Sequence, residues 1–390
     1  MRLNSFLDKV YSFQLPRKIL FGVGISEKVG LEAKALGGRE ALLVTDQNLR
    51  RIGIPERIEE ALVREGLNVD VFTDVEAEPR LEVAEAIAEA VRRRKYDIVV
   101  GVGGGSVLDM AKVAAIAATN FRPMRHYVGV DLVEKAGLPK VLLPTTAGTG
   151  SEVTNISVVT LTEDEMKTAI VSSHLFGDVA IVDPSLTYTL PPCLTASTGL
   201  DALSHALEAV MSINANPITD SLALQAIRLI FTYLSEAYRS GNAESRYGMS
   251  LSSLISGIAL ANAGVCLGHA VAYTFAVSYG VPHGVSCGLV LPYAFRFNAS
   301  SISWKLPQIA EAMRLDAEKL KTEELTTAIS EAIFKLMGEL QAPRKLRDLG
   351  IPEGAMSKMA DKLLGMKRLI QRNPKLLSKE DALKLIKEMW

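Results

Sequence analysis

The chain has 390 residues, of which 48% are hydrophobic and 22% are charged, and its formal net charge is −1. This length exceeds one ordinary hydrophobic core, so we expect a globular protein with two domains. A near-neutral net charge gives no support for a nucleic-acid partner, and no apolar run is long enough to predict a membrane-spanning helix. The densest basic run, at 92–95, closes a predicted helix, where positive charges complement the helix dipole.

Cysteine usage and the N-terminal residues bear on the cellular compartment. The three cysteines, Cys193, Cys266 and Cys287, are scattered and form no CxxC pair. A low, odd count favours a reducing compartment over a disulfide scaffold. The first residues contain neither the apolar core nor the small-residue cleavage site of a signal peptide. We therefore expect a cytoplasmic location.

The first half of the chain alternates predicted strands with predicted helices. Residues 16–21 predict a first strand, and a near-continuous apolar run at 41–46 predicts a buried parallel strand that ends on Asp46. Amphipathic patterns at 54–66 and 78–95 predict helices. This alternation is typical of an α/β domain with a parallel sheet.

A glycine-rich loop then follows a predicted strand. Gly103, Gly104, Gly105 and Ser106 precede a helix that we expect to begin near Val107. Glycines allow a phosphate to approach the backbone closely, and a helix N-terminus supplies free N–H groups. No Lys-Ser/Thr follows the glycines, so this is not a nucleoside-triphosphate P-loop. A plain tight turn is the alternative, but three consecutive glycines favour a phosphate-binding loop.

A second loop of this kind occupies 144–151, directly after another apolar strand. Its bare backbone and hydroxyl groups could bind a pyrophosphate or a ribose, and the threonines concerned are Thr145, Thr146 and Thr149. A β-hairpin is predicted next, with Lys167 entering its second strand. The last strand of this half is predicted at 178–184.

From about residue 186 the pattern becomes helical, and three of the five histidines lie in this half. Asp201 and His205 are four residues apart on a predicted helix, so they share one face. His269 lies on a second predicted helix, and His283 lies in a predicted Gly-Val-Pro-His-Gly turn. One carboxylate and three imidazoles suit iron(II), zinc or nickel better than magnesium or calcium. Separately satisfied histidines are the alternative, but an unpaired Asp201 in these apolar surroundings would be costly to bury.

Long ordered motifs along nearly the whole chain resemble the iron-containing (group III) alcohol dehydrogenase family. They include GVGGGSVLDMAK, PTTAGTGSEVT, TGLDALSHALEA and GVPHGVSCGLVLP. The resemblance implies an architecture like that of dehydroquinate synthase, with a Rossmann-like α/β domain at 1–185 and an all-α metal-binding domain at 186–390. Because the glycine loops and the metal residues lie in different halves, we expect the active site at a cleft between the domains. The resemblance also implies a homodimer.

The resemblance assigns roles to individual residues. It places Asp201, His205, His269 and His283 on the four positions that bind Fe(2+) or Zn(2+). It places the cofactor contacts on Asp46, Gly103, Gly104, Gly105, Ser106, Asp109, Thr145, Thr146, Thr149 and Lys167. A carboxylate at Asp46 should repel a 2′-phosphate, so we expect NAD(H) rather than NADP(H).

Tyr273 is a departure from the family pattern. Many members of the family carry a histidine there, close to the nicotinamide, and that histidine is often assigned a proton-relay role. A tyrosine has an ordinary pKa of about 10 and would relay protons less readily at neutral pH unless the metal lowers that pKa. Tyr273 is the candidate relay, water is the alternative, and the substrate could differ from a simple primary alcohol.

The predicted reaction is hydride transfer between an alcohol and the corresponding aldehyde or ketone. The metal would act as a Lewis acid on the substrate oxygen, and the nicotinamide would carry the hydride. The alternatives are a metal- and NAD-dependent lyase resembling dehydroquinate synthase, a polyol (glycerol-type) dehydrogenase, and a non-catalytic nucleotide sensor. The Asp-His-His-His set and the sparse charge around 250–295 argue against the lyase.

Overall fold

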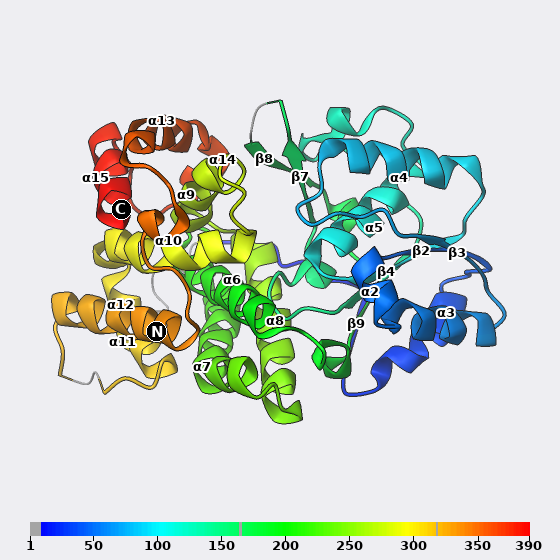
Figure 1. The fold of residues 1–390 in the computed structure, drawn as a ribbon, viewed down its shortest axis with the longest axis horizontal. Coiled ribbons are helices and arrows are strands. Elements are labelled where there is room, and N and C mark those ends of the chain that lie inside the picture. The colour runs from blue at the N-terminus through cyan, green and yellow to red at the C-terminus, as the bar shows by residue number, and fades with distance from the viewer. Residues whose placement is uncertain (1–8, 164–165, 317–318) are drawn as a thin grey trace. The chain divides into compact units, whose positions relative to one another are not determined.

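A computed structural model describes residues 9–163, 166–316 and 319–390 (Figure 1). The chain forms two compact units. One contains Leu15–Leu190, and the other contains Pro191–Trp390 together with the described N-terminal residues up to Gln14. The first unit is built on β-sheets, and the described part of the second contains helices and no strand. The predicted combination of an α/β half and a helical half is therefore confirmed.

The centre of the first unit is a six-stranded parallel sheet with the order β1-β9-β6-β4-β2-β3. Its strands are β1 (Lys18–Phe21), β2 (Glu40–Val44), β3 (Asn68–Phe72), β4 (Ile98–Gly103), β6 (Lys140–Pro144) and β9 (Val179–Val182). Every residue of β4 and β6 is buried, as expected for central parallel strands covered on both faces. The connecting helices are α1 (Val29–Ala35), α2 (Gln47–Arg51), α3 (Ile54–Arg64), α4 (Leu81–Arg93) and α5 (Gly105–Ala117).

Alternate residues of the strands face two separate hydrophobic cores. Leu42 and Val44 of β2 pack in the core that includes α4 and α5. Ala41 and Leu43 pack in the opposite core, which includes α1 and α3. This division follows from the two-residue period of a strand, which sends successive side chains to opposite faces.

A three-stranded sheet completes the first unit, with the order β5-β8-β7. Its strands are β5 (Gly129–Val130), β7 (Ile156–Leu161) and β8 (Met166–Val171). The pair β7 and β8 is antiparallel, so the predicted hairpin is confirmed. Lys167 lies in β8, opposite Thr160 of β7.

The second unit is a set of packed helices, in which α7 contacts both α6 and α8 (Figure 1). The helices are α6 (Pro192–Met211), α7 (Pro217–Arg239), α8 (Ala243–Ala263), α9 (Leu267–Ala276), α10 (His283–Asn298), α11 (Leu306–Ala312), α12 (Thr322–Glu339), α13 (Met356–Gly365), α14 (Lys367–Ile370) and α15 (Lys379–Met389). Local signals define several helix starts. The side chain of Asn216 accepts hydrogen bonds from two backbone N–H groups of α7, and Pro217 occupies the first helical position.

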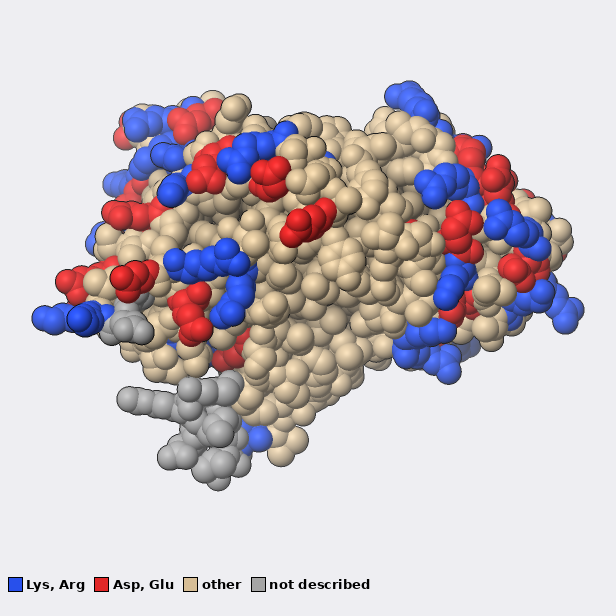
Figure 2. Space-filling view, turned by 90° about the horizontal axis from the view of Figure 1, so that it is seen from below, with Lys and Arg blue, Asp and Glu red and all other residues tan. Residues whose placement is uncertain are grey.

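The surface and the helices bear on possible partners. On the face shown in Figure 2, Lys and Arg side chains lie among Asp and Glu side chains, in agreement with the small net charge. Over the described residues, no single helix has both the length and the apolar character to cross a membrane. One pair, α8 and α9, meets both criteria when taken together, and it is bent by 101°.

Candidate metal centre and cofactor loops

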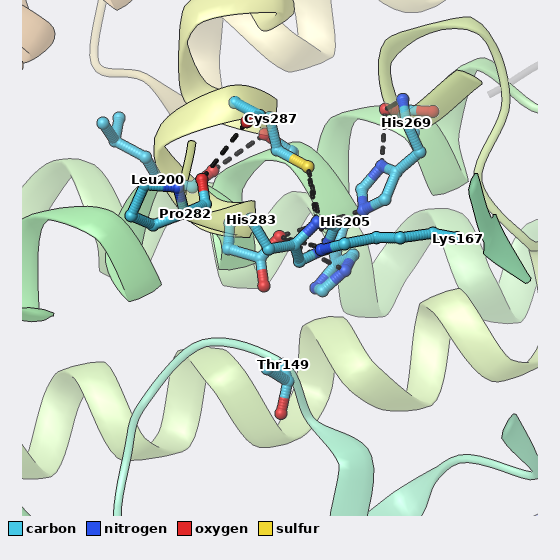
Figure 3. Close-up of polar contacts among 12 residues, drawn as sticks. Thr149, Lys167, Leu200, His205, His269, Pro282, His283 and Cys287 are labelled. Atoms are coloured by element: carbon cyan, nitrogen blue, oxygen red, sulfur yellow. Dashed lines mark hydrogen bonds and ion pairs between the residues drawn. The ribbon is translucent and has the colours of Figure 1, made fainter. Parts of the chain in front are cut away.

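Three helices bring four predicted metal ligands together. Asp201 and His205 lie one turn apart on α6, His269 lies on α9, and His283 is the first residue of α10. One ligand atom from each residue lies within 4.8 Å of the others. Figure 3 shows the imidazoles of His205, His269 and His283 converging from their separate helices. The prediction that Asp201 and His205 share one helical face is therefore confirmed.

The distances within this cluster fit a metal ion better than hydrogen bonds. Atom Oδ1 of Asp201 lies 3.6 Å from Nε2 of His205, 3.8 Å from Nε2 of His269 and 3.5 Å from Nε2 of His283. These separations are too long for N–H···O hydrogen bonds. Four donors at about 2.1 Å around one tetrahedral ion would lie about 3.4 Å apart, which is close to the observed spacing.

Two atoms of the cluster are buried polar groups that lack hydrogen-bond partners. Among the described residues, no group hydrogen bonds to Oδ1 of Asp201 or to Nε2 of His269, although both atoms are buried. Leaving such atoms unpartnered costs about 1–3 kcal/mol each. The side chain of His283 is 25% exposed, whereas those of Asp201 and His269 are 2% exposed. The donor set therefore fits a divalent ion with one accessible side.

His283 does not lie in the loop that the sequence suggested. The glycines and the proline of Gly-Val-Pro-His-Gly indicate a turn, but α10 begins at His283, directly after Pro282. Gly284 serves a different purpose from turn formation. A Cβ atom at this position would lie 2.3 Å from the backbone oxygen of Ser197, so glycine allows α10 to approach α6 closely.

Tyr273 lies one turn after His269 on α9, beside two of the imidazoles. Its ring centroid is 6.1 Å from that of His269 and 5.7 Å from that of His283. Burial raises the pKa of Tyr273 to about 12. The phenol of the protein without metal is therefore protonated at neutral pH.

The sequence reasoning missed Glu208, which lies on α6 and is fully buried. Its Oε1 atom accepts a hydrogen bond from the backbone N–H of His269 at 2.9 Å and lies 2.9 Å from Nδ1 of that imidazole. Burial by itself would raise the pKa of Glu208, but the contacts with His269 and Cys266 lower it below the usual value. The signal was available, because Asp201, His205 and Glu208 have the spacing i, i+4, i+7 of one helical face.

Cys287 is a second residue near the cluster that the sequence reasoning did not single out for the site. Its Sγ atom lies 3.6 Å from Nδ1 and 3.7 Å from Nε2 of His283 (Figure 3). Burial raises the pKa of this thiol to about 11. In the protein without metal, Cys287 is therefore a neutral thiol at physiological pH.

The first glycine loop connects β4 to α5. The helix begins at Gly105, two residues earlier than predicted, so Ser106 belongs to its first turn. A Cβ atom on Gly103 would lie 2.5 Å from Val107, and one on Gly105 would lie 2.6 Å from Thr149. A Cβ atom on Gly104 would meet nothing closer than 3.4 Å. Gly103 and Gly105 therefore permit close packing, whereas a Cβ atom on Gly104 would make only an ordinary van der Waals contact, with the side chain of Thr146.

The second loop follows β6, the sheet neighbour of β4. Because parallel strands end at one edge of a sheet, both loops emerge together. The backbone N–H of Thr145 donates a hydrogen bond of 3.0 Å to the backbone oxygen of Gly103. The hydroxyl of Thr149 accepts one of 3.2 Å from the backbone N–H of Ser151. A Cβ atom on Gly104 would approach Thr146 at 3.4 Å, so all three threonines border the first loop.

Asp109 is held by groups of the protein itself. Its Oδ1 atom accepts hydrogen bonds from the hydroxyl of Ser151 at 2.6 Å and from Nζ of Lys112 at 3.2 Å. Its Oδ2 atom accepts one of 2.8 Å from the backbone N–H of Val158. Asp109 therefore links α5, which follows the first loop, to the segment that follows the second loop.

Lys167 and Asp46 also have partners within the first unit. Nζ of Lys167 lies 2.9 Å from the carboxylate of Glu78, and the Lys167 side chain is 4% exposed. The backbone N–H of Glu78 donates to the hydroxyl of Ser106 at 3.1 Å. Asp46 follows β2 and caps α2, accepting hydrogen bonds from the backbone N–H groups of Asn48 and Leu49.

Comparison with known proteins assigns the family. The family model for iron-containing alcohol dehydrogenase matches residues 16–184, and that for the C-terminal part of the Fe-containing alcohol dehydrogenase family matches residues 195–390. A curated relative, long-chain-alcohol dehydrogenase 1 of Geobacillus thermodenitrificans, is 40% identical over 92% of this chain and 92% of its own length.

Solved structures agree with this assignment. A structure of 1,3-propanediol oxidoreductase has a TM-score of 0.94 and 36% identity, covering 98% of this chain and 100% of its own. Sulfoacetaldehyde reductase from Bifidobacterium kashiwanohense, solved in complex with NAD+, has a TM-score of 0.87 and 32% identity over 98% and 99% of the two chains. The protein therefore belongs to the iron-containing alcohol dehydrogenase family and is an NAD-linked oxidoreductase that interconverts alcohols with aldehydes or ketones.

Proposed function

We propose that Asp201, His205, His269 and His283 together bind one divalent metal ion, either iron or zinc. The observation that carries this proposal is the pair of buried, unpartnered donor atoms on Asp201 and His269. A set of one carboxylate and three imidazoles is a donor set for these ions rather than for magnesium or calcium. The partial exposure of His283 supports an open position through which a substrate could enter.

The cofactor in this proposal is NAD(H), bound by the loop that contains Gly104 and by the loop at 144–151. The missing side chain of Gly104, at the start of α5, supports close approach of a pyrophosphate to the backbone and to the N-terminus of this helix. The carboxylate of Asp46, at the end of β2, would repel the 2′-phosphate of NADP(H). The relative solved with NAD+ supports the same choice. Lys167, Asp109 and the threonines would shape the site around the cofactor.

The bound groups would supply the redox chemistry, with the metal ion as a Lewis acid for the substrate oxygen and NAD+ as the hydride acceptor. The chain's own residues hold and orient these groups. The buried positions of Asp201, His205 and His269 keep water away from the ligand atoms. Without metal, burial raises the pKa of Tyr273 to about 12, so its hydroxyl carries the proton that the proposed relay would pass on.

The decisive experiment uses the full chain under anaerobic conditions. We would load it with iron(II) or with zinc, measure the metal content, and follow NADH oxidation with a panel of short and long aldehydes and ketones. Asp201→Ala should lose both metal and turnover, because it removes the only carboxylate of the donor set. A metal-free protein that retains full activity would refute the proposal.

The cofactor choice needs a separate comparison. NADH should be used better than NADPH, and Asp46→Ser should narrow that preference by relieving the repulsion of the 2′-phosphate. An unchanged preference would remove Asp46 from the proposal. Small alcohols and aldehydes are the partners that this activity requires. Homodimerisation and a cytoplasmic location remain predictions from the sequence and the resemblance.

A further inference from the structure

We propose that Glu208 is a positioning residue that fixes the orientation and the tautomer of His269 and, together with Asp201, sets the site for a divalent rather than a trivalent ion. This inference rests on the proposed metal site, because it concerns how that site is tuned. Glu208 does not itself belong to the cluster of candidate ligands.

The carboxylate of Glu208 lies in a cradle of backbone N–H groups at the start of α9. Glu208 is 0% exposed, and both of its oxygens face the start of α9. Oε2 accepts a hydrogen bond from the backbone N–H of Cys266, and Oε1 accepts one of 2.9 Å from the backbone N–H of His269. A Cβ atom on Gly268 would lie 2.1 Å from Oε1, so this cradle forms only because residue 268 is glycine.

The carboxylate of Glu208 decides which ring nitrogen of His269 carries the proton. An ionised carboxylate can only accept hydrogen bonds, and Oε1 of Glu208 lies 2.9 Å from Nδ1 of His269. The proton of the neutral imidazole must therefore sit on Nδ1, which leaves a lone pair on Nε2. Nε2 is the buried, unpartnered atom that faces Asp201. Glu208 thus presents His269 in the one tautomer that can bind a metal ion.

The buried site carries the negative charges of two carboxylates, Asp201 and Glu208. Among the described residues, neither Asp201 nor Glu208 forms an ion pair with a lysine or an arginine. Two carboxylates contribute a charge of −2, and metal-bound imidazoles are neutral. A divalent ion balances this charge, whereas a trivalent ion would leave an uncompensated positive charge in a buried environment, which is costly.

The test is Glu208→Gln, which keeps the side-chain shape and removes the negative charge. We expect zinc and cobalt(II) to bind about 10–100-fold more weakly, as measured by competition with a chelator. The Fe(III)/Fe(II) midpoint potential should rise, because loss of a negative charge destabilises Fe(III) more than Fe(II). The absorption spectrum of the cobalt(II) form should change, since a neutral amide holds the Nδ1 proton of His269 more weakly than a carboxylate does. A purely structural role would move none of these quantities.

The matched control is Asp220→Asn. Asp220 is another buried carboxylate of the helical unit, but it pairs with Lys305 at 2.8 Å. This variant should lose stability without any change in metal affinity or midpoint potential. Gly268→Ala is the second test variant, because its Cβ atom would displace the carboxylate without changing the charge of the protein. It should also weaken metal binding at least about tenfold.

The outcomes separate this inference from the proposed metal site. If the wild-type protein and Asp201→Ala hold equally little metal, the proposed site itself fails. If the wild type binds one ion, Asp201→Ala binds none, and Glu208→Gln matches the wild type in affinity and potential, then Glu208 is not a positioning residue. If Glu208→Gln does not fold, the metal affinity of Gly268→Ala is the test. If Gly268→Ala binds metal as tightly as the wild type does, the inference is overturned.

Discussion

Replacing the buried Lys112 by methionine should destabilise the α/β unit strongly. The Lys112 side chain is 0% exposed and donates hydrogen bonds to Asp109 at 3.2 Å and to the hydroxyl of Ser151 at 2.7 Å. It also donates to the hydroxyl of Thr154 at 3.1 Å and to the backbone oxygen of Ile156 at 2.7 Å. Methionine fills a similar volume but leaves a buried carboxylate without its cation and the other acceptors without their donor.

Removing one partner of a buried ion pair costs about 3–5 kcal/mol. For a unit of the size of Leu15–Leu190, each kcal/mol lowers the melting temperature by about 2–4 °C, so the expected decrease is roughly 6–20 °C. The measurement is urea and thermal unfolding of the full chain, followed by circular dichroism. NADH affinity should fall as well, because Lys112 joins the helix after the first proposed cofactor loop to the segment after the second.

Lys140→Met is the matched control for this prediction. Lys140 is also buried, at 4% exposure, but Nζ has one long contact of 3.5 Å to the backbone oxygen of Leu138 and no ion pair among the described residues. Burial lowers the pKa of both lysines, which means that burial by itself disfavours the charged ammonium group at each position. Any difference between the two variants should therefore come from the partners of Lys112. Equal costs for Lys112→Met and Lys140→Met would refute the reasoning. The double variant with Asp109→Asn should cost less than the sum of the two single variants, by about 1–3 kcal/mol.

Three further predictions concern single residues. Gly104→Ala should fold normally, because its methyl group would make only an ordinary contact with Thr146. It should bind NADH at least about tenfold more weakly in a fluorescence titration, because the methyl group would hinder the proposed approach of phosphate to the backbone. Unchanged affinity would remove this loop from the proposed cofactor site. Burial raises the pKa of Glu152 from 4.5 to about 7. Between these pH values the folded protein therefore holds a proton that the unfolded chain releases. The free energy of unfolding should consequently fall by about 3 kcal/mol as the pH rises from 4.5 through 7. Glu152→Gln should lack this loss when unfolding is compared at pH values below and above that range. Asp183 accepts hydrogen bonds from the backbone N–H and hydroxyl groups of Ser26 and Ser185. Asp183→Asn should therefore lower the free energy of unfolding by about 1–3 kcal/mol. An unchanged midpoint of urea unfolding would show that these hydrogen bonds do not stabilise the fold.

Local patterns were sufficient for much of the fold. The near-continuous apolar run of β2 predicted a buried parallel strand because such strands are covered on both faces. The i, i+4 spacing predicted that Asp201 and His205 share a face, since that relation depends only on the helical period. The parallel pairing of β4 with β6, which the structure shows, brings the two loops after these strands to one edge of the sheet.

The remaining features depend on contacts between distant segments, which no local pattern encodes. Gly284 resembles a turn residue until the approach of α10 to Ser197 is known. The hydrogen bond between the carboxylate of Asp109 and the hydroxyl of Ser151, 42 residues later in the chain, cannot be inferred from the glycine-rich motif that contains Asp109. The role of Glu208 depends on the position of α9, about sixty residues later in the chain.

The pairing of β1 with β9 has a consequence for how the protein folds during synthesis. β1 lies at the start of the α/β unit and forms its parallel ladder with β9, from Lys18 opposite Val179 to Phe21 opposite Val182. The ribosome must therefore release almost the whole unit before its first strand has a partner. Gln14, just before β1, also has a distant partner. Its backbone N–H donates to the side-chain oxygen of Asn262, and its backbone oxygen accepts from the side-chain nitrogen of that residue, 248 positions later. Such high contact order slows folding and leaves strand edges unpaired for longer, so we expect the nascent chain to rely on chaperones until β9 has emerged.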